Sequence, residues 1–136
     1  MAAKTRLTHR LAQRRENGER GTSTVETVVI YPVILLLIFT MVQAGLWYHS
    51  REVALHAANA ASVAASAENA SDGQGQAAAT AFVNRAGALR EAGVSVSRGA
   101  ETVTATVTGR SPSLIPGMQL PLITQSSTSA IERYVP

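Results

Sequence analysis

The sequence predicts an α+β membrane protein. We expect one long N-terminal transmembrane α-helix extended by an alanine-rich segment, then a second amphipathic helix and a small three-stranded antiparallel sheet. Three observations lead to this fold class. A long apolar run follows a basic N-terminal arm, an alanine-rich segment without Gly or Pro continues that run, and the hydrophobic period changes to two from Val94 onward.

The basic character of the chain is concentrated in its first residues. Residues 1–21 carry a net charge of +4, whereas residues 22–136 carry −1. A basic arm can bind nucleic acid, but no aromatic residue alternates with these cations as single-strand binding requires. Directly before an apolar run, such an arm holds the cytoplasmic end of a membrane segment. We therefore predict that residues 1–21 form a cytoplasmic leader, disordered in isolation, with no nucleic-acid partner.

Residues 22–48 are predicted to form the transmembrane helix. Residues 27–50 contain no Lys, Arg, Asp or Glu, and 17 of the 21 residues in 28–48 are hydrophobic. A helix of that length spans roughly 30 Å, the thickness of the hydrocarbon core. Trp47 and Tyr48 lie at its far end, where interfacial aromatic anchors are typical. The basic leader predicts a single pass through the cytoplasmic membrane, with the N-terminus in the cytoplasm.

Two further features shape this helix. Pro32 lacks a backbone N–H and is expected to kink the helix near Val28. Beyond the span, the alanine-rich residues 49–68 are expected to continue as helix and to open the exterior domain, residues 49–136. Small residues recur there every four positions, a pattern that lets another helix approach closely: Ala57, Ala61 and Ala65, and beside them Ala54, Ala58, Ser62 and Ser66.

The rest of the exterior domain is predicted to form one helix and three strands. A second helix is predicted over residues 76–92, capped by Ser71 or Asp72 and ended by Gly93. Its apolar face would contain Ala79, Phe82, Val83, Ala86 and Leu89. Alternating valines then predict strands at about residues 94–98 and 102–108, joined by a hairpin loop, and a third strand follows over 122–133.

Enzymatic and metal-binding chemistry is not indicated. The chain has no cysteine, which excludes disulfides and thiolate metal sites. His49 and His56 share a helix face, but neither His9 nor any other residue is placed to close a metal site with them. No nucleophile elbow, catalytic triad or phosphate loop is present. We therefore expect no catalytic residues, no metal and no cofactor, and a protein that is not an enzyme.

Glu26 is the one carboxylate at the front edge of the apolar run. It is separated by four small or apolar residues from Gly21, and Gly21 directly follows the basic arm. This arrangement resembles the processing site of prepilins of the type IV pilin superfamily. The resemblance implies that a prepilin peptidase cuts between Gly21 and Thr22, so that Glu26 becomes the fifth residue of the mature chain. It also implies docking, in which the Glu26 carboxylate pairs with the amine of Thr22 on a neighbouring subunit.

A narrower resemblance covers residues 20–134. The stretch GTSTVETVVIYPVILLLIFTMVQAGLWY, the alanine-rich segment after it and the final VTATVTGRSPSLIPGMQLPLITQSSTSAIERY are similar to the TadE-like family of tight-adherence pilus systems. Pro32 matches the family's proline within the span. Two positions depart from the pattern: Thr22 replaces a hydrophobic first residue, and Thr27 stands where many members place an aromatic.

The resemblance implies a minor pseudopilin, because residues beyond Asp72 make the chain longer than the main fibre subunits. Its expected partners are the membrane, other pilins or pseudopilins, the prepilin peptidase, the inner-membrane platform and the assembly ATPase, with a role in pilus biogenesis or adhesion. Two alternatives stay open. One is an uncut bitopic accessory protein, and the other is a secreted protein whose signal peptide is cleaved after Val42-Gln43-Ala44.

Overall fold

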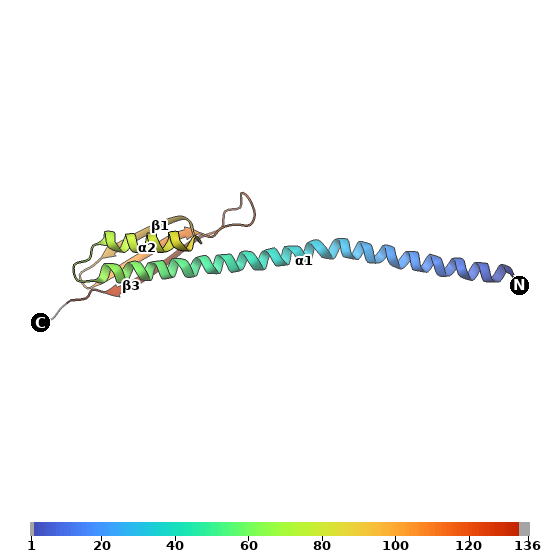
Figure 1. Ribbon diagram of the computed structural model, residues 1–136, viewed down its shortest axis with the longest axis horizontal. Helices are drawn as coiled ribbons and strands as arrows, with labels where there is room; N and C mark the ends of the chain where they lie inside the picture. The colour runs from blue at the N-terminus through green and yellow to red at the C-terminus, as the bar shows by residue number, and fades with distance from the viewer. Residues whose placement is uncertain (1, 134–136) are drawn as a thin grey trace. The chain divides into compact units, whose positions relative to one another are not determined.

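The computed structural model describes the backbone of residues 2–133 and the side chains of residues 24–133. Its elements are α1 (Ala2–Ser66), α2 (Asp72–Ala86), β1 (Arg90–Arg98), β2 (Thr102–Arg110) and β3 (Leu122–Ala130) (Figure 1). The chain divides into two compact units, Met1–Met41 and Val42–Pro136. The elements confirm the predicted α+β class, with a long apolar helix, a second helix and a three-stranded antiparallel sheet.

Helix α1 is longer at its N-terminal end than the sequence suggested. It begins at Ala2, so the leader continues the helix instead of forming the disordered arm expected of it in isolation. The composition of the leader explains this, because alanine, arginine, glutamine and glutamate all have high helix propensity. The helix also continues through Pro32 without interruption.

The C-terminal end of α1 is fixed by partners from the sheet. The helix ends at Ser66, two residues before the predicted end at Glu68. The Arg98 guanidinium donates 2.7 Å hydrogen bonds to the carbonyls of Ala65 and Ala70, and the Ser66 carbonyl accepts the amide of Glu132 at 3.0 Å. The bonds to Ala65 and Ser66 satisfy carbonyls that a helix terminus leaves without intrahelical partners.

The small-residue stripes of α1 form one wall of the hydrophobic core. All seven residues of the two stripes are buried: Ala54, Ala57, Ala58, Ala61, Ser62, Ala65 and Ser66. The buried hydroxyl of Ser62 lies 3.2 Å from Ser127 Oγ and accepts a 2.9 Å hydrogen bond from Ser129, both on β3. The stripes are thus covered by α2 and the sheet of the same chain, and Gly75 of α2 lies close to Ala61 and Ala65, which confirms close helix packing.

Helix α2 differs from its predicted bounds at both ends. It covers 72–86 instead of 76–92. It ends early because Gly87 adopts a left-handed conformation (φ 64°) and its amide bonds to the carbonyl of Val83 at 2.9 Å. Glycine takes this conformation at little cost and commonly ends helices in this way. Ser71 occupies the N-cap position, as predicted, but its side chain makes no capping hydrogen bond. Leu89 therefore lies beyond the helix, where it packs against the core.

Gly75 is a point of close approach between α2 and α1. A Cβ atom built on Gly75 would lie 2.7 Å from the Ala61 carbonyl oxygen and 2.9 Å from the Ala65 Cβ. We expect Gly75→Ala to lower the free energy of unfolding of the domain by about 1–3 kcal/mol, because the two helices must separate. Hydrogen–deuterium exchange of the β2 amides in the full-length protein measures this loss.

Gly73→Ala is the matched control for this prediction. A Cβ on Gly73, in the same helix, would meet only Ser71 Oγ at 3.7 Å. This substitution should leave the exchange of β2 unchanged or slow it, since alanine favours the helix by up to about 1 kcal/mol. Equal exchange in the two variants would contradict close packing of α2 on α1.

The sheet has the strand order β1-β2-β3, and both strand pairs are antiparallel. Period-two alternation holds along β2, where Val103, Ala105 and Val107 are all fully buried. The loop between β1 and β2 is short, and Gly99 donates its amide to the Thr102 carbonyl at 2.8 Å. The predicted hairpin is therefore present, with its alternate side chains facing α1 and α2 through the shared core.

The strand bounds differ from the predicted ones in each case. Strand β1 begins at Arg90 instead of Val94, because the helix ends early and the chain has already turned into the sheet. Glu91 has a positive φ of 53°, and the register between β1 and β2 shifts between Arg90 and Gly93. Strand β2 extends to Arg110, paired with Leu122, and β3 ends at Ala130 instead of Arg133.

Candidate membrane and assembly site

The first part of α1 presents an apolar surface without cover. By length and composition, the stretch Thr24–Ser66 could cross a membrane, and the described residues include one such helix. Large hydrophobic side chains from Val25 to Val42 are all at least 44% exposed. A continuous exposed surface of this size is typical of contact with lipid or with other proteins. This helix is consistent with a single-pass membrane protein.

Glu26 lies near the start of this stretch, and its side chain is exposed. Among residues 24–133, no side chain forms an ion pair or hydrogen bond with the Glu26 carboxylate. Gly21 and Thr22 lie within the bounds of α1, before residues 24–133, for which the structure describes side chains. A carboxylate at the edge of lipid is costly unless it reaches water or a partner.

The other predicted site residues lie further along α1. Trp47 is 38% exposed and Tyr48 is 59% exposed, so both rings are available to an interface at the end of the apolar segment. Their role as interfacial anchors stays a prediction. Pro32 lies inside the helix and supplies no amide to the carbonyl of Val28. The kink expected there also stays a prediction.

Gln43 is a functional candidate that the sequence interpretation missed. Its side-chain amide donates to the Pro112 carbonyl at 3.1 Å, and its Oε1 accepts the Leu114 amide at 2.9 Å. Gln43 thereby ties the loop between β2 and β3 to α1 across about 70 positions of sequence. This loop extends past the ends of both strands in Figure 1. The available signal was a single carboxamide within an otherwise apolar run, a residue type that needs a partner when it leaves water.

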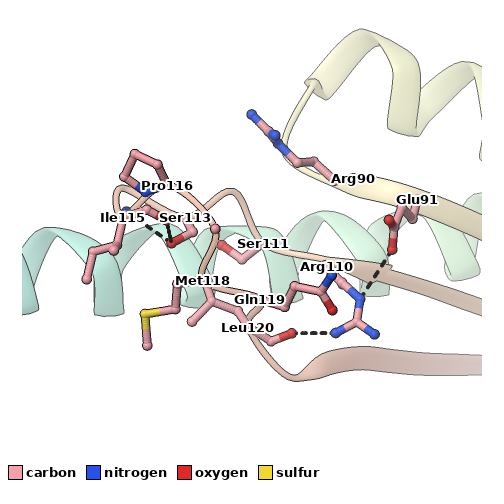
Figure 2. Close-up of a pocket in the computed structure, with 11 residues that line it drawn as sticks. Arg90, Glu91, Arg110, Ser111, Ser113, Ile115, Pro116, Met118, Gln119 and Leu120 are labelled. Carbon is pink, nitrogen blue, oxygen red and sulfur yellow. Dashed lines mark hydrogen bonds and ion pairs between the residues drawn. The ribbon is translucent and has the colours of Figure 1, made fainter.

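A cavity of about 280 Å³ lies between this loop and the start of β1 (Figure 2). Arg110 bridges its two sides, with Nε 3.2 Å from the Glu91 carboxylate and Nη1 donating to the Leu120 carbonyl at 2.7 Å. In Figure 2 the Arg90 side chain points away from this pair. The ion pair and hydrogen bond hold the base of the loop against the sheet. The cavity lining contains no histidine and no nucleophile–base pair.

The two histidines of the exterior domain, His49 and His56, both lie on α1. His56 Nε2 lies 4.0 Å from Glu52 on the same face of α1, and its ring is 6.4 Å from the ring of Phe82. Within residues 24–133, no three His, Cys, Asp or Glu side chains lie close enough to hold a metal ion. The features that remain are an exposed apolar helix, a carboxylate at its start and a loop fastened near its end.

These features define a class of protein in which one membrane-compatible helix carries a small α+β domain. The family model of TadE-like proteins matches residues 21–63, the same family that this part of the sequence was found to resemble. The match begins at Gly21 and contains Glu26, Pro32 and Gln43, and it supports an association with a tight-adherence pilus system. The resemblance of residues beyond 63 stays a prediction. No curated protein and no solved structure matches the chain.

Proposed function

We propose that the chain is a minor pseudopilin-like subunit of a tight-adherence pilus. A prepilin peptidase would cut it after Gly21, and it would enter the pilus assembly through its N-terminal helix. The observation that carries this proposal is the TadE-like match, which starts at Gly21 and covers the exposed apolar helix with Glu26 at its front. The resemblance supplies the remaining partners, namely other pseudopilins, the inner-membrane platform and the assembly ATPase.

Docking would occur through the charges at the start of the mature chain. Cleavage creates an α-amino group at Thr22, four positions before the Glu26 carboxylate. Within a packed array of helices in lipid, either charge alone is costly, so pairing the carboxylate of one subunit with the amine of its neighbour relieves both. Since the pair forms at one axial offset only, it also sets the register between subunits. The removed leader would hold the subunit in the membrane until cleavage.

The burial pattern supports assembly through the first part of α1. Its side chains from Val25 to Val42 are exposed, whereas the buried face that begins at Ser50 is covered by the chain's own domain. The surface left for helix packing between subunits is therefore the apolar one. The domain formed by α2 and the sheet would then lie outside the cytoplasmic membrane, where a minor subunit could prime, cap or anchor a fibre.

The two alternative functions, an uncut bitopic protein and a secreted protein, predict different mature chains. An uncut bitopic accessory protein would keep the same span and leave Glu26 unexplained. A secreted protein cut after Ala44 would lose Gln43 and with it both hydrogen bonds to the loop at Pro112 and Leu114. It would also divide α1, which continues without a break from the apolar stretch to Ser66. These contacts favour a chain that keeps residue 43.

Processing is tested by the N-terminus of the protein recovered from native membranes. We expect intact mass and terminal sequencing to give a chain that starts at Thr22. Gly21→Val should block the cut, because the family's peptidase requires glycine on the N-terminal side, and the unprocessed mass should accumulate. Gly18→Val changes a second glycine of the leader and should leave processing intact. A wild-type chain that starts at Met1, Ala2 or Gly45 would contradict the proposal.

A further inference from the structure

The loop between β2 and β3 combines apolar exposure with a complete absence of charge. Leu114, Ile115 and Met118 are 42%, 59% and 51% exposed. No charged residue occurs from Ser111 to Ile131. An exposed apolar tip of this kind is unfavourable in water and requires a covering surface.

Gln43 fixes the position of this loop along α1. It lies four residues before Trp47, or about 6 Å along the helix toward the apolar segment. It also belongs to the charge-free stretch 27–50. Its two hydrogen bonds, to Pro112 and Leu114, therefore hold the loop on the apolar side of the aromatic residues that are expected to mark the membrane interface.

Most residues of the loop do not need water to satisfy a backbone N–H group. Two of the seven residues 112–118 are prolines, which have no N–H, and three others have amides with protein partners. Leu114 donates to Gln43 Oε1, Ile115 to Ser113 Oγ at 3.1 Å, and Met118 to the Ile115 carbonyl at 3.2 Å. The amides of Ser113 and Gly117 have no partner among the described residues, so this backbone suits the edge of a bilayer, where water still reaches polar groups, and not the hydrocarbon core.

Charged side chains lie at the base of the loop and not at its tip. Figure 2 shows Arg110 bonded to Glu91 and to the Leu120 carbonyl, with Ile115 and Met118 at the other end of the loop. Arg90 stands beside this base. The apolar tip of the loop would contact lipid acyl chains, and the arginines at its other end would lie near the lipid phosphates.

We propose that residues 112–118 form a second membrane contact, which enters the leaflet next to Trp47 and Tyr48 and is held at that depth by Gln43. The partner is the lipid surface itself. The inference rests on α1 crossing the membrane, but not on cleavage at Gly21 or on incorporation into a pilus. Its consequence is a domain fixed to the bilayer at two points, so that the domain is restrained before extraction into an assembly.

Tryptophan quenching by brominated lipids tests this proposal on the full-length chain. The background is Trp47→Phe, which removes the one native tryptophan. Ile115→Trp places the probe on the loop, and Val63→Trp places it on a residue of α1 that is 64% exposed and 20 positions beyond Gln43. Each variant is reconstituted into vesicles of phosphatidylcholine and phosphatidylglycerol with brominated acyl chains, and the wild-type Trp47 serves as the interfacial reference.

We expect the Ile115→Trp probe to lose most of its emission, as Trp47 does, and the Val63→Trp probe to be unquenched. Adding Gln43→Leu to the loop probe should restore its emission while the chain still floats with the vesicles. A loop probe as bright as Val63→Trp on floating chains would overturn the proposal, and a blue-shifted but unquenched probe would assign the loop to a protein partner instead. Failure of the chain to float would overturn the membrane span as well, whereas the pilin proposal is tested separately at the N-terminus.

Discussion

Glu26→Ala is expected to leave the protein in the membrane but to exclude it from the pilus assembly. The exposed apolar residues that insert α1 are unchanged, so membrane insertion should persist. The partner amine, however, would be left without its counter-charge in lipid. Breaking a buried pair in this way costs at least about 3 kcal/mol, which corresponds to a loss of incorporation of about 100-fold. Co-purification with other pilus subunits, relative to the amount in membranes, measures it.

Glu68→Gln is the control for this experiment. Glu68 is also an exposed carboxylate of this chain, but it lies just beyond the end of α1 at Ser66 and far from the apolar stretch. Its replacement should leave incorporation unchanged. Glu26→Gln separates charge from shape, since the amide fills the same space without the negative charge. Normal assembly of Glu26→Ala or Glu26→Gln would remove the docking mechanism, whatever the result of N-terminal sequencing.

Val103→Asp is expected to unfold the exterior domain without affecting insertion of α1. Val103 is fully buried in the central strand β2, between Arg98 of β1 and Ser129 of β3. The guanidinium of the paired Arg98 is already bonded to the carbonyls of Ala65 and Ala70, so a carboxyl group at position 103 would be buried without a free partner, which should cost more than about 4 kcal/mol. Trypsin measures the result, because Arg98 and Arg110 lie within strands and become cleavable when the sheet opens.

Val63→Asp makes the same chemical change at an exposed position of α1. The Val63 side chain is 64% exposed, so the aspartate stays hydrated and stability should change by less than about 0.5 kcal/mol. Trypsin resistance of Val103→Asp equal to that of Val63→Asp would mean that β2 does not occupy the centre of the sheet. Together with Glu26→Ala, the pair separates a defect of the domain from a defect of docking.

Local sequence patterns were sufficient where one period extends over many residues. The charge-free stretch 27–50 predicted the apolar helix, and the alternation of Val103, Ala105 and Val107 predicted a strand with one buried face. Side chains on one face recur every 3.6 residues in a helix and every 2 in a strand. Burial of one face therefore produces apolar residues at that spacing in the sequence. The family resemblance at Gly21 and Glu26 was similarly local, and the TadE-like match begins at the same glycine.

The end of α2 and the start of β1 could not be predicted in the same way. Gly87 and Gly93 are both reasonable helix ends, and the apolar spacing continued to Leu89. The structure ends the helix at Gly87 because Leu89 packs on the core from the chain that leads into the sheet. The partly buried Leu89 packs on the core for tertiary reasons and follows the helical spacing by coincidence. Tertiary packing therefore decides between two local signals of equal strength.

Residue patterns alone indicate the α+β class, the apolar helix, the position of Glu26 and the resemblance to TadE-like proteins. How the small-residue stripes are covered, and where the loop before β3 is held, depends on packing between distant segments. Ser62 bonds to Ser127 and Ser129, and Gln43 bonds to residues about 70 positions away. The local sequence of either segment does not indicate which distant residue it will contact. A hydrogen bond between distant residues depends on the whole fold, because the same side chain can be satisfied by water until packing excludes it.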